Sequence, residues 1–292
     1  YAIVGTVSGT SISFGSEVQF ESGTSIEHSA TFDSTNGKVV VAYLDNSNSD
    51  KGTAVVGTVS GNSISFGTPV VFNNSTTENV AATFDSTNGK VVITYTDNGN
   101  SWYGTAIVGT VSGTSISFGS ESVFESASSS EMSAVYDSYA DKVVITYRDE
   151  GNSSYGTVIA GTVSGTSISF GSAVVYESAS TDTQSASYDF WNQKVVIGYR
   201  DGGNSSYATA IVTTASSTTL STGNFVGLAA EAISNGATGS VTIAGGTNSS
   251  QSGLTTSSKL YANGDGTVSH NPSAVEAGIS VSSTEVIVKI HS

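Results

Sequence analysis

The chain has 292 residues, no cysteine and a formal net charge of -15, and only 11% of its residues are charged. The absence of Cys excludes disulfides, thiolate metal sites and cysteine nucleophiles. The acidic charge disfavours nucleic acid and anionic membranes as partners. A composition rich in Gly, Ser, Thr, Asn and Val, with 13 Tyr and 11 Phe, is typical of a β-rich protein with many turns.

The N-terminal three quarters of the chain repeat themselves. The segment VGTVSGTSISFGS at 4–16 returns, with few changes, at 56–68, 108–120 and 160–172. Asp33, Asp85, Asp137 and Asp189 mark the same spacing of 52 residues. A period near 50 with four short β segments is typical of propeller blades.

One repeat divides into four expected strands, which in the second copy are 80–85, 90–97, 104–113 and 115–124. We therefore predict an all-β fold, a β-propeller of four-stranded blades over 1–222. The half-blade is 1–20, and the blades run at about 26–73, 78–125, 130–177 and 182–222. Residue 1 stands in the middle of a repeat, so we expect further sequence upstream.

The blade pattern resembles that of sialidase-like propellers. A short strand ends in Asp, an apolar strand ends in YxD, and a Gly/Asn turn leads to an outer SFGS strand. The turns DNGNSWY (97–103), DEGNSSY (149–155) and DGGNSSY (201–207) resemble the Asp-box turn of that family. Tyr95, Tyr147 and Tyr199 stand where that motif has Ser or Thr. The resemblance therefore implies the architecture and not the activity.

Residues 225–292 do not follow the repeat and contain short apolar segments separated by Gly- and Asn-rich turns. This pattern predicts a small β domain that ends in a strand at 284–290. SNGATGSVTIAGG, SGLTTSSKLYANGDGTVS and SSTEVIVKI resemble the C-terminal module of structural proteins of marine tailed phages, including tail fibres. The 52-residue unit also resembles repeats of such virion proteins. The resemblance implies an extracellular virion location, with the small domain serving in attachment or oligomerisation.

Strand directions place the turn between the second and third strands, and the link into the next blade, on one face of the propeller. Here the repeats differ from one another. The equivalent residues are His28, Val80, Met132 and Gln184, next to Glu27, Asn79, Glu131 and Thr183. We interpret this variation as a ligand surface specialised blade by blade, and the alternative is drift in a solvent-exposed loop.

The same face carries aromatic and cationic candidates. Tyr103, Tyr155 and Tyr207 recur with Trp102 beside the first, and they can stack on sugar rings. The alternative is that each Tyr caps its own blade. Arg148 and Arg200 occupy one repeat position and are further candidates. Trp191, in DFWNQ, lies on the opposite face, where we expect packing or a subunit contact.

Catalysis is not expected. A sialidase needs three arginines around its substrate carboxylate, and only Arg148 and Arg200 are present in the repeats. The periodic Asp residues suit turn capping better than a single catalytic centre. His28, His270 and His291 lack metal-ligand spacing. We expect no cofactor, and calcium at DNSNSD (45–50) is the alternative to a plain Asx turn.

These observations favour a non-enzymatic surface or tail protein of a phage virion that binds a host-surface glycan or receptor through one propeller face. The expected partners are other virion proteins and the host glycan, without nucleic acid or membrane insertion, and we expect a homo-oligomer. Three alternatives are a purely structural or decoration virion protein, a secreted bacterial carbohydrate-binding protein and a divergent glycoside hydrolase.

Overall fold

The computed structural model describes residues 1–214, 227–229, 241–243, 247–249, 254–262, 268–269 and 276–288. The chain divides into two compact units, Tyr1–Ala215 and Ser216–Ser292. Regular structure in the described residues is β-strand apart from three single-turn 3₁₀ helices, which confirms the predicted all-β class. No helix in this part of the chain is both long and apolar enough to cross a membrane. The predicted domain boundary at 222–225 lies outside the described residues, as do His270 and His291.

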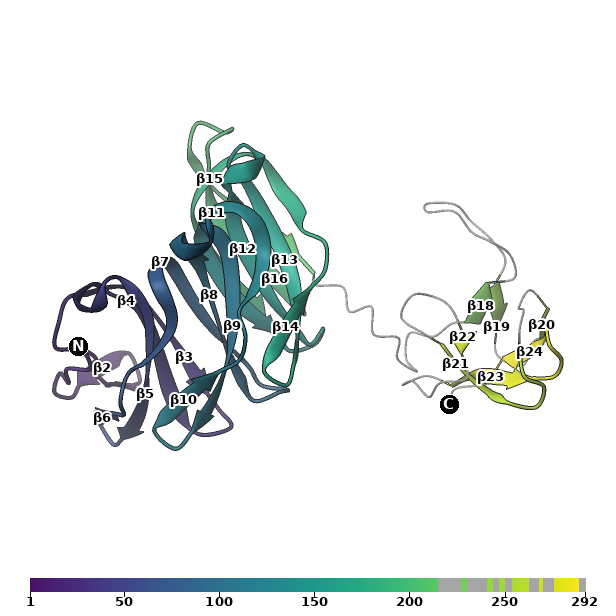
Figure 1. The fold of residues 1–292 in the computed structure, drawn as a ribbon, viewed down its shortest axis with the longest axis horizontal. Helices are drawn as coiled ribbons and strands as arrows, with labels where there is room; N and C mark the ends of the chain where they lie inside the picture. Colours follow the sequence, from purple (N-terminus) through teal and green to yellow (C-terminus); the bar gives the residue numbers. More distant parts are fainter. Residues whose placement is uncertain are drawn as a thin grey trace. The chain divides into compact units, whose positions relative to one another are not determined.

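The first unit repeats one set of elements (Figure 1). The crossing strands are β3 (Ser25–Asp33), β7 (Val70–Asp85), β11 (Ser122–Asp137) and β15 (Val174–Asp189). The second strands are β4 (Lys38–Asp45), β8 (Lys90–Asp97), β12 (Lys142–Asp149) and β16 (Lys194–Asp201). The 3₁₀ helices η1 (Asn46–Asn48), η2 (Asn98–Asn100) and η3 (Glu150–Asn152) follow the first three of these.

The third strands are β5 (Lys51–Ser60), β9 (Tyr103–Ser112), β13 (Tyr155–Ser164) and β17 (Tyr207–Thr213). Short hairpin partners follow the first three, as β6 (Ser63–Phe66), β10 (Ser115–Phe118) and β14 (Ser167–Phe170). The N-terminal residues form a separate hairpin of β1 (Gly5–Ser8) and β2 (Ser11–Phe14). All pairings in this unit are antiparallel.

Three of the crossing strands run over 16 residues, longer than predicted, because each one belongs to two sheets. The first residues of β7 pair with β5, as Val71 does with Thr53, and its last residues pair with β8, as Ala82 does with Ile93. The segment 80–85 is therefore the end of the crossing strand β7. The strand predicted at 115–124 is divided, with 115–118 in the hairpin partner β10 and 122–124 at the start of β11. We call the four groups the first sheet (β3–β6), second sheet (β7–β10), third sheet (β11–β14) and fourth sheet (β15–β17), each of the first three completed by the start of the next crossing strand.

The hydrogen-bonded order is open. It runs β17-β16-β15-β13-β12-β11-β9-β8-β7-β5-β4-β3, and the two ends do not pair with each other in the described residues. The ring is therefore not closed within the described residues, and the predicted β-propeller is not confirmed.

The core lies between sheets that stack face to face. Side chains on both faces of β4, β8 and β12 are buried, because these sheets are covered on two sides, whereas β16 is buried mainly at alternate residues. Between the first and second sheets, Val40 and Val56 pack against Ile93 and Tyr95. The approach is close at Gly67, whose added Cβ would lie 1.9 Å from the Thr114 carbonyl oxygen of the next sheet.

The second unit contains short strands: β18 (Gly227–Ala229), β19 (Val241–Ile243), β20 (Thr247–Asn248), β21 (Lys259–Ala262), β22 (Val268–Ser269), β23 (Glu276–Ser280) and β24 (Val286–Val288). Five of them form a sheet in the order β20-β24-β23-β21-β22. Leu260, Ala277 and Val286 are buried there. The strand predicted at 284–290 is present as β24 over its central residues.

Candidate functional site

The predicted ligand residues gather along one edge of the stacked sheets, which we call the rim. The rim consists of the turns 46–51, 98–103, 150–155 and 202–207 and the bends of the crossing strands at 26–28, 78–80, 130–132 and 182–184. Each described bend pairs with shifted register, and its central residue, such as Asn79, has a positive φ. In β7 the change of sheet comes just before the bend, since Thr76 pairs with Lys51 and Thr77 pairs with Asp97.

The turns and bends of the rim are joined by backbone hydrogen bonds. The Thr77 N–H donates to the Asp50 carbonyl at 2.9 Å, and the Ser129 N–H donates to the Trp102 carbonyl at 3.2 Å. Asp50 and Trp102 both have φ near +60°, a conformation that is uncommon outside Gly. Their unusual backbone is thus part of the connection between sheets.

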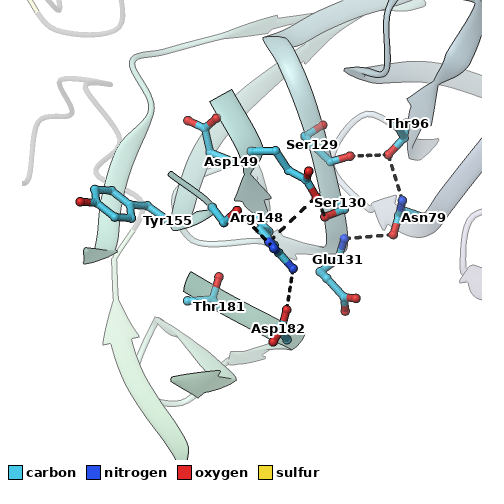
Figure 2. Close-up of polar contacts among 12 residues, drawn as sticks. Asn79, Thr96, Ser129, Ser130, Glu131, Arg148, Asp149, Tyr155, Thr181 and Asp182 are labelled. Atoms are coloured by element: carbon cyan, nitrogen blue, oxygen red, sulfur yellow. Dashed lines mark hydrogen bonds and ion pairs between the residues drawn. The ribbon is translucent and has the colours of Figure 1, made fainter. Parts of the chain in front are cut away.

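A ladder of side chains runs along the rim from sheet to sheet. The side chains of Glu27, Asn79 and Glu131 each accept a hydrogen bond from the backbone N–H of the residue 52 positions later. The Asn79 to Glu131 step measures 3.0 Å (Figure 2). The Glu131 to Thr183 step measures 2.9 Å. The ladder position therefore carries a hydrogen-bond acceptor in the first three repeats, and this acceptor is either a carboxylate or an amide oxygen.

The four predicted ligand positions next to the ladder lie in different surroundings. Val80 and Met132 pack against the cores between sheets, and Gln184 is buried. His28 is exposed, with its Nε2 3.0 Å from the Ser25 hydroxyl and its ring stacked near that of Tyr43. Burial lowers the pKa of His28. Ligand contact by these four residues stays a prediction.

Gln184 differs from Met132 for a reason within the fold. It accepts a hydrogen bond from the Tyr176 hydroxyl at 2.5 Å and donates one to the Thr181 hydroxyl at 3.0 Å. Phe124 occupies the position of Tyr176 in the preceding repeat, beside Met132. The two positions therefore change together between these repeats, and this paired change was the available sequence signal for packing.

The two predicted arginines converge on one carboxylate. Arg148 and Arg200 contact the two oxygens of Asp182 at 2.7 and 2.5 Å. Arg148 also donates to the Ser154 hydroxyl at 3.2 Å, while its Nε is buried and has no hydrogen-bond partner, 3.9 Å from Glu150 (Figure 2). Both arginines thus have internal partners, and Arg200 is the more exposed of the two.

The predicted aromatic residues of the rim are spread over three sheets. Tyr103 and Tyr155 are half-buried, whereas Tyr207 exposes 63% and Trp102 exposes 39% of its surface. The ring of Tyr155 points away from Arg148 and Asp182 in Figure 2. Trp102 and Tyr207 are the rim aromatics that a ligand can reach most easily.

The rim is acidic. Glu27 lies among Glu78 and Glu131, and burial raises its pKa, with repulsion by these two neighbours adding to the effect and the backbone N–H of Asn79 opposing it. Burial also raises the pKa of Asp149. A neutral or cationic ligand suits this charge better than an anion does.

The expected calcium alternative at 45–50 has its carboxylates engaged in the turn. Asp45 accepts a hydrogen bond from the Ser47 hydroxyl at 2.5 Å, and Asp50 accepts one from the Asn46 amide at 2.7 Å. Within the described ranges no group of three or more His, Cys, Asp or Glu residues is arranged to hold a metal ion.

Sequence reasoning did not single out the exposed aromatic residues Tyr139 and Phe190 on the opposite edge, and it assigned Trp191 to packing or a subunit contact. In the structure these three side chains expose 67%, 65% and 89% of their surface. The available signal was the replacement of Ser and Thr in STNG by aromatic residues in the last two repeats.

Comparison with known proteins does not assign the chain to a family. No protein-family model matches the sequence, and no curated protein matches it.

Proposed function

We propose that the chain is a non-enzymatic surface or tail component of a phage virion that binds neutral glycans of the host surface at the rim. One observation carries the binding proposal: four sheets with the same framework present different side chains at the rim. Trp102 has no aromatic counterpart, and Arg148 and Arg200 replace Leu44 and Thr96. Aromatic rings beside amide and carboxylate groups suit sugar rings and their hydroxyls.

The proposal includes the architecture. The stacked antiparallel sheets, linked by crossing strands, are taken as consecutive blades of a β-propeller. Support comes from the face-to-face burial between sheets and from the side-by-side crossing strands, which are linked by the rim ladder. Ring closure would need strands beyond the open order of the described residues.

The non-enzymatic part of the proposal is supported by the engagement of the recurring carboxylates. Asp33, Asp85, Asp137 and Asp189 accept backbone hydrogen bonds in the hairpins that follow them. Asp97, Asp149 and Asp201 do the same in the rim turns. Such carboxylates serve turn structure in every repeat.

The virion part rests on the resemblance of residues 225–292 and of the repeats to phage structural proteins. Localisation on intact particles tests it. Density for the small C-terminal unit against a tail or capsid, with the rim outward, is the expected result. Recovery of the chain only as a free cellular protein would contradict this part and favour the secreted carbohydrate-binding alternative.

The binding part is tested with an array of neutral and anionic glycans. We expect neutral glycans to bind the full chain and the signal to fall about tenfold in Trp102→Ala, the change expected from losing one stacked ring. Trp102→Phe, which keeps an aromatic ring at this position, is the matched control and is expected to keep most of the binding. Equal binding by the full chain and Trp102→Ala would contradict a role for Trp102.

A purely structural virion protein is the second candidate, and one observation favours it. Several residues that differ between repeats at the rim already have internal partners, as Gln184 has in Tyr176 and Arg200 has in Asp182. This candidate predicts particle localisation without glycan binding. The array and the particle experiment together therefore separate the two.

A further inference from the structure

The edge opposite the rim, which we call the turn edge, is built from the hairpins 34–37, 86–89, 138–141 and 190–193. In each hairpin, the carboxylate of the Asp that ends the crossing strand accepts hydrogen bonds from the hairpin backbone. Asp189 Oδ1 accepts the N–H groups of Trp191 and Asn192, both at 3.0 Å, and Asp137 Oδ1 accepts those of Tyr139 and Ala140 at 3.0 and 2.9 Å. These bonds hold the hairpin backbone in place before any ligand arrives.

The hairpins contact the crossing strands of the next sheet. The Tyr139 N–H donates to the Tyr188 hydroxyl at 3.3 Å, and the Tyr136 hydroxyl lies 2.6 Å from the Thr87 hydroxyl. The hairpin 138–141 is therefore joined to the strand that leads into the hairpin 190–193. Tyr139 projects from the first of these, and Phe190 and Trp191 project from the second, with their two rings 5.8 Å apart and edge to face.

The fold does not require these three rings. The hairpins 34–37 and 86–89 are made with Ser and Thr at the same positions, and their Asp residues accept the same backbone bonds. Trp191 is 89% exposed, so it gains little from packing within the chain. An aromatic group replaces a small polar one only in the last two hairpins, where the replacement leaves apolar surface in water.

The size of the surface indicates a small partner. Three aromatic side chains can bury at most roughly 450–750 Å² on their own side of a contact. Most of their neighbours on the same two hairpins are polar, namely Ser138, Asp141, Asn192 and Gln193, so these neighbours add mostly polar surface. In a standard protein interface each partner buries roughly 800 Å², and the interface has an apolar centre. One or two sugar rings match the smaller area.

The polar neighbours indicate the class of sugar. Asn192, Gln193 and Asp141 stand on the same two hairpins and offer amide and carboxylate groups. The Asn192 amide is oriented by Asp189, which it contacts at 2.6 Å. The carboxylates disfavour sulfated or carboxylated sugars. We propose that Tyr139, Phe190 and Trp191 form a second carbohydrate-binding surface, which takes neutral pyranose rings. This surface is separate from the rim and does not depend on the rim binding a ligand.

The test compares three proteins by calorimetric titration with neutral oligomers of glucose, mannose, galactose and N-acetylglucosamine. They are the full chain, Trp102→Ala, and a variant that combines Tyr139→Thr, Phe190→Ser and Trp191→Thr. The combined variant restores the residues of the first two hairpins, so it is expected to fold. We expect at least one neutral oligomer to bind the full chain and Trp102→Ala alike, and to bind the combined variant about tenfold more weakly or worse.

A spectroscopic readout locates the contact. The chain has two Trp residues, so Trp102→Phe leaves Trp191 as the only one. The sugar identified by titration should change the fluorescence of this variant, and choline chloride and a sulfated oligosaccharide should not. A response to choline or to the sulfated sugar in place of neutral sugars would overturn the proposal.

The remaining outcomes also decide the matter. Equal sugar binding by the full chain and the combined variant, or no binding of any neutral oligomer, overturns the second surface. Self-association of the full chain that disappears in the combined variant assigns the rings to a second copy and likewise overturns it. Loss of binding in Trp102→Ala alone supports the rim and overturns this inference. Loss of binding in the combined variant alone supports the second surface and contradicts binding of that sugar at the rim.

Discussion

The rim and the turn edge both carry residues that differ between repeats. At the rim several of these residues have partners inside the protein, whereas at the turn edge they are exposed to solvent. At the rim several residues that change between repeats bond to a second residue that also changes. Tyr176 donates a hydrogen bond to Gln184, and Arg200 forms an ion pair with Asp182. At the turn edge Phe190 and Trp191 replace Ser and Thr and face water. Variation among copies of a repeat therefore indicates a ligand only where no partner inside the protein explains it.

The largest expected effect comes from breaking a matched pair at the rim. Gln184→Met introduces the residue of the preceding repeat and removes the acceptor of the hydroxyl of Tyr176, a partly buried residue. A buried hydroxyl that loses its partner costs about 1–3 kcal/mol. We expect the free energy of unfolding to fall by about 2 kcal/mol, measured by urea denaturation.

The matched control adds Tyr176→Phe to Gln184→Met and so recreates the Phe and Met pair of the third sheet. The double variant should recover most of the lost stability, because no polar group is then left unpaired. If Gln184→Met has normal stability but weaker glycan binding, Gln184 is a ligand contact and the packing explanation is wrong.

A smaller loss is expected from removing the carboxylate shared by two arginines. Asp182→Ala leaves Arg148 and Arg200 without their ion-pair partner and should lower the free energy of unfolding by about 1 kcal/mol, less at high salt. Glu78→Ala is the control, since Glu78 occupies the same position one hundred and four residues earlier and has acidic neighbours. Equal losses in the two variants would show that the ion pairs contribute nothing specific.

The sequence predicts the period, the strand class and the hairpins, because turn residues such as those of STNG and the buried second strands are local signals. It does not predict that β7 runs unbroken over 16 residues. The segment from Asn73 to Asn79 looks like a loop, and only its pairing with two different sheets makes it strand. Likewise, the partner of Gln184 depends on how two sheets stack, and no short-range pattern contains that information.

The rim ladder gives a prediction about pH. Glu27 has a raised pKa, so the folded state binds a proton more tightly than the unfolded state, whose pKa is near 4.5. Stability contributed by this group is therefore highest in acid and falls as the pH rises from 4.5 through the raised value. Glu27→Gln keeps an acceptor for the Asn79 N–H and removes the charge.

We expect the free energy of unfolding of Glu27→Gln to exceed that of the unchanged chain by about 0.5 kcal/mol at pH 7 and to match it near pH 4. The gain is small because solvent screens a group that is only partly buried. Thermal unfolding at the two pH values measures both. Glu131→Gln is a useful comparison at the next acidic rung of the ladder. A loss of stability at pH 7 would mean that the charged ladder bond outweighs burial and repulsion.

The smallest expected effect on stability is at the turn edge, and it is the most informative about function. Phe190→Ser with Trp191→Thr recreates the Ser and Thr of the first two hairpins and keeps Asp189 bonded to the backbone. Because both rings are largely in water, the free energy of unfolding should change by less than about 0.5 kcal/mol. Chemical denaturation of this variant beside Gln184→Met compares the two edges directly. A loss of more than about 1 kcal/mol would show that the rings stabilise the fold, and the fold would then explain their presence without a ligand.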